Sequence, residues 1–223
     1  MIDSLLHPRI IENKDWATVL FVLSLVLIAL TKSAFENRFS EFTKLIFSAK
    51  YIKTYRNNSH LISVFTITLF IIQVISFAFF IQLLLSSYAL AYKYDWMLFI
   101  QLFTFIAYFL LAKLLINIII ANAFTIENLM IRFSLKKIAY RSYIGLILLP
   151  VNIILYYNDT FLQNLFLPIL ITLLLLNGVI YILAIKSYQS LIMSKLFYFI
   201  LYLCALEIAP YYFIYYWFTK GNA

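Results

Sequence analysis

The chain has 223 residues, of which 65% are hydrophobic and only 12% are charged, and its formal net charge is +8. A water-soluble domain is about half apolar and a quarter charged, so this composition excludes a soluble globular protein. The basic residues lie in short segments between long apolar runs. That arrangement argues against a nucleic-acid partner and is typical of a multi-pass membrane protein.

Six apolar runs are candidates for helices that cross the bilayer, whose hydrocarbon core is about 30 Å thick. In chain order they cover residues 16–31, 61–86, 96–120, 143–157, 162–185 and 196–218. The runs are continuous rather than alternating, which favours helices over a β-barrel. The sequence therefore predicts an all-α, polytopic helix bundle of about six transmembrane helices, forming a single membrane domain over residues 1–223.

Two connections between these runs have the pattern of amphipathic helices, over roughly residues 34–55 and 123–140. Each places apolar side chains on one face and basic side chains on the other. Such helices lie in the membrane interface, with the basic face near anionic headgroups. They either anchor the bundle or dock a partner. The predicted basic surface consists of Lys44, Lys50, Lys53, Arg56, Arg132, Lys136, Lys137 and Arg141.

The distribution of Lys and Arg predicts the orientation of the chain. Twelve of these 17 residues fall in the connections that follow the first, third and fifth runs. Four lie on the other side, and Lys113 lies within a run. Connections rich in Lys and Arg stay in the cytoplasm, so both termini are predicted to be periplasmic.

Two charged residues lie within the predicted spans and are the first candidates for functional residues. A charge at the centre of a bilayer costs roughly 2.5–3.5 kcal/mol on insertion scales. Lys113 lies nearer the cytoplasmic end of its span, so its long side chain can extend to the headgroups. Glu207 lies near the middle of the last span, where a short side chain must be protonated or paired.

Glu207 has polar company on its own helix. Tyr211 lies one turn away and can donate a hydrogen bond, and Pro210 removes a backbone hydrogen bond beside it. This arrangement suits either a proton or ion relay or a structural carboxyl bonded to a neighbouring helix. Amides inside spans usually join helices by hydrogen bonds. The amides of this kind considered as site candidates are Asn117, Asn152 and Asn177.

Prolines and missing motifs narrow the functional classes further. Pro150, Pro168 and Pro210 all lie in the last three spans, so a kinked cavity is expected there. The sequence has no zinc-protease motif, no cysteine cluster and no glycine-rich phosphate loop. We therefore predict no metal site and no cofactor, and an enzyme is less expected than a non-enzymatic protein.

The run LYLCALEIAPYY, residues 201–212, resembles the C-terminal signature of a bacterial integral-membrane family of unknown function. Lys113 and the run GLILLP, residues 145–150, are similar to that family as well. The resemblance implies a multi-span protein of the bacterial inner membrane and brings no assigned activity. It also singles out Lys113, Glu207 and Pro210.

Three functions are compatible with these features. The first is a non-enzymatic inner-membrane scaffold or accessory subunit, with another membrane protein or a second copy of the chain as partner. The second is a small proton- or ion-coupled transporter component that uses Glu207. The third is a lipid-modifying membrane enzyme.

Overall fold

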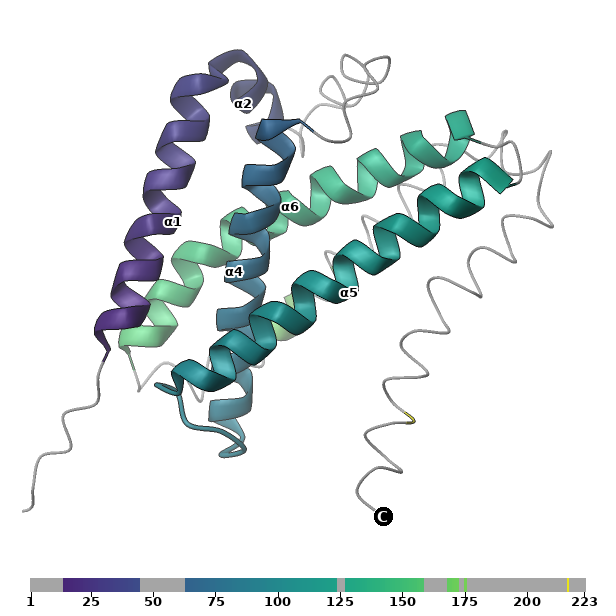
Figure 1. Cartoon of the computed structure of the whole chain (residues 1–223). Coiled ribbons are helices and arrows are strands. Elements are labelled where there is room, and N and C mark those ends of the chain that lie inside the picture. Colours follow the sequence, from purple (N-terminus) through teal and green to yellow (C-terminus); the bar gives the residue numbers. More distant parts are fainter. Residues whose placement is uncertain are drawn as a thin grey trace, which may run out of the picture.

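The computed structural model describes residues 14–44, 63–123, 127–158, 168–172, 175 and 216. Their regular structure is helical throughout (Figure 1). The helices are α1 (Asp15–Ala34), α2 (Glu36–Thr43), α4 (Val64–Ser87), α5 (Trp96–Ala123) and α6 (Glu127–Tyr157). The all-α prediction is therefore confirmed.

Four helical segments of this region are long and apolar enough to cross a membrane: α1, α4, residues 96–116 of α5 and residues 137–157 of α6. They coincide with the first four predicted spans. Each has 20 or more residues, and about 20 are needed to cross the hydrocarbon core. The chain is therefore a helical membrane protein. The last two predicted spans lie almost entirely outside the described residues, so the total of six stays a prediction.

Helix α4 is the centre of the bundle and packs against α1, α5 and α6 (Figure 1). In its most apolar stretch 56% of the residues are buried, compared with 17% in α5. Ser63 caps the start of α4, where its side chain accepts a hydrogen bond from the backbone N–H of Thr66. A helix that is apolar on all sides can be buried on all sides, and α4 has this composition.

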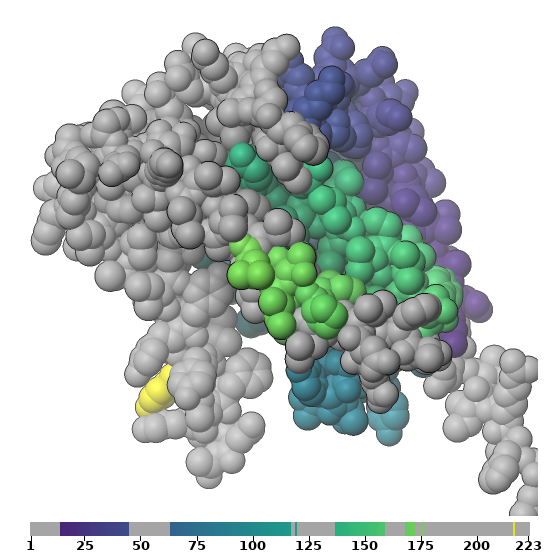
Figure 2. Space-filling model, turned by 180° about the vertical axis from the view of Figure 1, so that it is seen from behind, coloured from purple at the N-terminus to yellow at the C-terminus, as the bar shows by residue number. Residues whose placement is uncertain are grey.

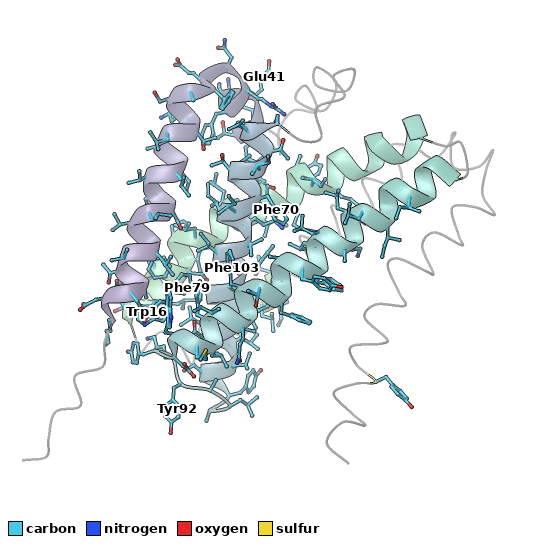
Figure 3. The ribbon with its side chains drawn as sticks, viewed as in Figure 1. Trp16, Glu41, Phe70, Phe79, Tyr92 and Phe103 are labelled. Carbon is cyan, nitrogen blue, oxygen red and sulfur yellow. The ribbon has the colours of Figure 1, made fainter. Side chains whose placement is uncertain are left out.

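The end of the bundle where α1 begins and α4 ends is filled by aromatic rings; we call it the aromatic end. Phe79 is at its centre, with ring centroids 5.8 Å from Trp16, 4.3 Å from Phe21, 4.5 Å from Phe99 and 6.0 Å from Tyr156. Figure 3 shows Trp16 and Phe79 at this end, and Phe70 away from it, nearer the start of α4. Three helices besides α4 contribute rings, so this cluster ties α1, α5 and α6 to it.

The turn after α4 is fixed by its backbone and by one buried amide. The N–H groups of Ala89 and Leu90 donate to the carbonyls of Ser86 and Leu85, a pairing that closes a helix with one left-handed residue. Ala89 is that residue, with φ 57°. Beyond it, Gln82 Nε2 donates to the carbonyls of Lys93 and Asp95 at 3.2 and 2.8 Å. The loop is thereby held against the bundle.

Polar atoms and a close backbone approach join α4 to α6. Asn152 Nδ2 donates to the Ser76 carbonyl at 2.7 Å, and Ser142 Oγ donates to Gln73 Oε1 at 3.0 Å. Between these contacts, a Cβ added at Gly145 would lie only 2.8 Å from the Gln73 Cα. Small residues and interhelical hydrogen bonds are the usual means of helix association in membranes.

The two predicted interfacial helices differ from the observed elements. Helix α2 covers only part of the first, residues 36–43, and residues 45–62 lie outside the described region. In place of a separate second helix, residues 127–157 form one helix that runs into the fourth span without interruption. No Gly or Pro precedes Gly145 in this segment, so nothing in it ends the helix. Helix α6 also continues past Pro150, whose side chain is exposed.

Figure 2 shows residues 168–172 lying against α6. Ile169 and Leu170 of this segment pack on the core cluster to which Leu148 and Leu155 of α6 belong. The chain after α6 therefore returns to the bundle at this point.

Candidate functional site

A cavity of about 550 Å³ opens between α4, α5 and α6; we call it the basic pocket. Among the residues that the structure describes, its lining has three basic, two neutral polar and eight apolar side chains. The residues that line it are Thr66, Ile67, Phe70, Ile71, Gln73, Leu110, Leu111, Lys113, Leu114, Leu115, Lys137, Ile138 and Arg141. Its volume is in the range of small-molecule sites, which is about 300–1,000 Å³.

The cations of the basic pocket come from two helices. Lys113 lies on α5 and is only 6% exposed, so its side chain faces the pocket and does not extend along the outer surface. Lys137 and Arg141 lie one turn apart on α6, and four-residue spacing places both on one face. The charges of Lys113 and Arg141 both act on Lys137. Three basic side chains therefore share one cavity.

Helix lengths place these cations near one end of the spans. Lys113 follows the first residue of α5 by seventeen positions, which corresponds to about 25 Å of helix. Lys137 precedes the last residue of α6 by twenty positions, which corresponds to about 30 Å of helix. On α4, the lining residues fall in the first ten positions of the helix. All three helices thus contribute from the end where α5 connects to α6.

Gln73 adds a neutral donor to the same cavity. Its side chain is 1% exposed, and its Oε1 accepts the hydrogen bond from Ser142. Its Nε2 has no hydrogen-bond partner and is buried. A buried amide N–H without a partner is uncommon, because the lost hydrogen bonds to water cost about 1–3 kcal/mol. This group is therefore available to an acceptor in the pocket.

The apolar wall of the basic pocket continues onto the outside of the bundle. Ile67 is 47% exposed and Leu115 is 58% exposed, although both line the cavity. Ile71 and Leu111 show the same combination. Since these side chains are on the surface of membrane-spanning helices, the pocket is continuous with the region that lipid occupies.

The predicted intramembrane candidates are distributed unevenly over the described residues. Lys113 lines the basic pocket, and Asn152 joins α6 to α4 away from it. Asn117 lies in α5 one turn after Lys113, and its side chain is outside the description. The remaining candidates lie outside the described residues altogether: Asn177, Glu207, Pro210 and Tyr211.

The predicted basic surface is divided in the same way. Lys137 and Arg141 line the pocket together with Lys113, whereas the sequence pattern had assigned Lys137 to a face opposite the apolar one. Lys44 is exposed at the end of α2. Arg132 and Lys136 belong to α6, without a description of their side chains. The other three lie outside the described residues: Lys50, Lys53 and Arg56.

The cavity expected from the prolines concerns spans that lie largely outside the described residues, and the basic pocket is a different one. That expectation placed a cavity among the last three spans, whereas the basic pocket lies between the second, third and fourth. The residue missed by sequence reasoning is Gln73 as a pocket donor. Its place in an otherwise apolar span was the available signal.

Among the residues that the structure describes, no group of three or more His, Cys, Asp and Glu could hold a metal ion. The described residues that line the basic pocket supply positive charge and hydrogen-bond donors, and none of these described residues is a carboxylate, histidine or cysteine. Such a lining matches an anionic ligand.

The fold and the pocket define a helical membrane protein with a basic cavity inside its bundle. The chain belongs to the family DUF4271, a domain of unknown function, whose sequence profile matches residues 17–218. This finding confirms an uncharacterised family. No curated protein and no solved structure matches the chain. The function must therefore be argued from the site itself.

Proposed function

We propose that the chain is a non-enzymatic accessory or scaffold protein of the bacterial inner membrane that binds an anionic amphiphile in the basic pocket. The observation that carries this proposal is the convergence of Lys113, Lys137 and Arg141 on one cavity with apolar walls. Ionisable residues within membrane spans usually face a bundle interior or cavity and mark a ligand or ion pathway.

Electrostatics favours an anion at this place. Three cations in one pocket repel one another, and water is less able to screen them here than at a protein surface. An anionic group in the pocket is attracted by all three. Arg141 can donate two parallel hydrogen bonds to a phosphate or carboxylate, and each lysine adds a compact charge.

The chemistry of the lining favours binding over catalysis. Hydrolysis or group transfer needs a positioned base, nucleophile or metal in addition to charge. In the described part of the chain, the polar lining residues are two lysines, one arginine, one threonine and one amide. Their common property is that they donate hydrogen bonds, which serves to hold an anion.

The binding step can be tested with purified full-length chain in a neutral detergent. Dodecyl phosphate is added, and the unfolding midpoint is measured. A ligand at 100 times its dissociation constant stabilises the folded state by about 2.7 kcal/mol. We expect the midpoint to rise for the wild type, and to rise much less for Lys137→Gln and Arg141→Gln. Lys32→Gln, an exposed lysine of α1, is the matched control and should behave like the wild type. No rise for the wild type would refute the proposal.

The accessory role needs a separate measurement. Several apolar side chains of α1 and α5 are exposed, and these outer helices are available to lipid or to another membrane protein. Extraction in a mild detergent, followed by identification of co-purifying membrane proteins, tests for a partner or a second copy. A chain that purifies only as a monomer without partners would contradict the scaffold role.

The transporter alternative has its own signature. Proteoliposomes containing the chain should show no proton flux that depends on Glu207 if the protein only binds its ligand. Flux that is present in the wild type and lost in Glu207→Gln would replace the binding proposal with a proton relay.

A further inference from the structure

We infer that the ligand of the basic pocket is an anionic phospholipid of the cytoplasmic leaflet, which enters sideways between α4 and α5. This inference rests on the proposed function and gives the identity of its ligand. Its phosphate group would lie among Lys113, Lys137 and Arg141, and its acyl region along the apolar wall.

The lining of the basic pocket is divided into a basic part and an apolar part. The cations come from α5 and α6 at one end of the spans, and the apolar residues come mainly from α4 and α5. A free inorganic anion would lose hydration against eight apolar side chains, and an amphiphile would bury its own apolar part there. A volume of about 550 Å³ also far exceeds what an inorganic anion fills.

The exposed apolar wall gives a lipid a route of entry into the pocket. Ile67, Ile71, Leu111 and Leu115 line the cavity and are also exposed on the outer surface of α4 and α5. A molecule dissolved in the bilayer meets this surface directly and reaches the cations without crossing water. A solute from the cytoplasm would meet apolar side chains first.

The cations of the pocket lie at the depth expected for the headgroups of one leaflet. The cations lie at the end of the spans where α5 connects to α6, close to Arg132 and Lys136 in the sequence. Segments rich in Lys and Arg stay on the cytoplasmic side, whose leaflet contains the anionic lipids. The headgroups of that leaflet and the cations of the pocket are therefore at a similar level.

The side-chain amide of Gln73 offers a hydrogen-bond donor to the lipid. Its Oε1 is held by Ser142, and its backbone is held against Gly145, so its Nε2 has a fixed direction. The free N–H is buried at a position that lines the pocket. It would donate to a phosphate or ester oxygen of the lipid, which accounts for an otherwise unsatisfied donor.

The test uses delipidated full-length chain in a neutral detergent and measures binding by native mass spectrometry and by the unfolding midpoint. The probes are phosphatidylglycerol, phosphatidylcholine and inorganic phosphate. We expect phosphatidylglycerol to bind and to raise the midpoint, and the other two to have little effect. Removal of one cation, as in Lys137→Gln or Arg141→Gln, should weaken phosphatidylglycerol binding about fivefold, since each cation near anionic lipid contributes about 1 kcal/mol.

Two further variants separate the pocket from general attraction to the membrane. Gln73→Leu should weaken phosphatidylglycerol binding while it keeps every charge. Lys32→Gln, on the surface of α1, should leave binding unchanged. Equal loss in Lys32→Gln and Lys137→Gln would overturn the inference, because the lipid would then bind the surface at large.

The outcomes also distinguish this inference from the proposed function. If dodecyl phosphate or inorganic phosphate binds and phosphatidylglycerol does not, the pocket holds an anion that is not a membrane phospholipid, and only the present inference fails. If no anionic probe binds, both fail. Equal binding of phosphatidylcholine and phosphatidylglycerol would show that the cations do not select the ligand, and would overturn the inference as well.

Discussion

The aromatic end and the basic pocket lie at different levels of the same bundle and treat a buried lysine in different ways. At the aromatic end, the Nζ of Lys93 lies 5.6 Å from the ring centre of Tyr94 and 5.4 Å from that of Tyr156, within reach of cation–π attraction. At the other site, Lys113 faces a cavity shared with two more cations. The first arrangement fills space and the second leaves it open.

This difference separates stability from function. Close-packed rings contribute many dispersion contacts, and in a membrane such packing is a main source of helix association. A cavity that holds like charges adds few dispersion contacts and does not strengthen helix association. Natural proteins accept such local cost where a ligand binds. Substitutions at the aromatic end should therefore affect folding, and substitutions in the basic pocket should affect binding.

The largest expected effect is at Phe79. Phe79→Ala removes a fully buried ring that contacts four others, and should lower the free energy of unfolding by about 3 kcal/mol or more. Reversible unfolding in mixed micelles measures this change. Phe105→Ala is the control, since that ring is 53% exposed on α5. Similar losses for both variants would show that the aromatic end is not a special centre of packing.

A smaller effect is expected where α4 and α6 approach most closely. Gly145→Ala places a methyl group 2.8 Å from the Gln73 Cα, and backbone atoms cannot move aside cheaply. Overpacking of this kind costs about 1–3 kcal/mol. Ile147→Ala, at an exposed site of the same helix, should cost less than Gly145→Ala in the same unfolding assay. Because Gln73 would be displaced, Gly145→Ala should also weaken ligand binding; unchanged stability would contradict this account of the interface.

How far the sequence predicted these two regions depends on the kind of signal each one gives. Continuous apolar runs predicted α1, α4, α5 and the spanning part of α6, because length and hydropathy alone determine whether a helix can cross a bilayer. The sequence did not predict that residues 127–140 and the following span form one continuous helix. Lys137 had been assigned to the end of an interfacial helix and Arg141 to the connection after it, whereas both lie within the single helix α6.

The basic pocket could be predicted only in part. Lys113 stood out because a charge inside a span needs an explanation. Its neighbours Lys137 and Arg141 are distant in sequence and lie on another helix, so their convergence depends on helix packing, which periodicity does not specify. Gln73 resembles any amide that joins two helices. Only the geometry shows that one of its ends is held by Ser142 and the other is free.

The next prediction concerns the buried lysine of the aromatic end. Lys93→Gln removes a cation that lies near the rings of Tyr94 and Tyr156, and should lower the free energy of unfolding by about 1 kcal/mol. Binding of an anionic amphiphile should not change, since Lys93 does not line the basic pocket. Thermal unfolding with and without dodecyl phosphate measures both properties. A loss of ligand binding in Lys93→Gln would remove the distinction between the two ends.

The smallest effect on folding, and the sharpest test of the comparison, is expected for Lys137→Gln. The ligand-free variant should differ from the wild type by less than about 0.5 kcal/mol, because the side chain is only partly buried and its removal also relieves repulsion from Lys113 and Arg141. Its gain in stability on addition of dodecyl phosphate should nevertheless be clearly reduced. Lys93→Gln should show the reverse pattern, with lower stability and normal ligand response. If Lys137→Gln instead unfolds as easily as Phe79→Ala, the lysine is a structural element of the bundle, and the basic pocket loses its role as a ligand site.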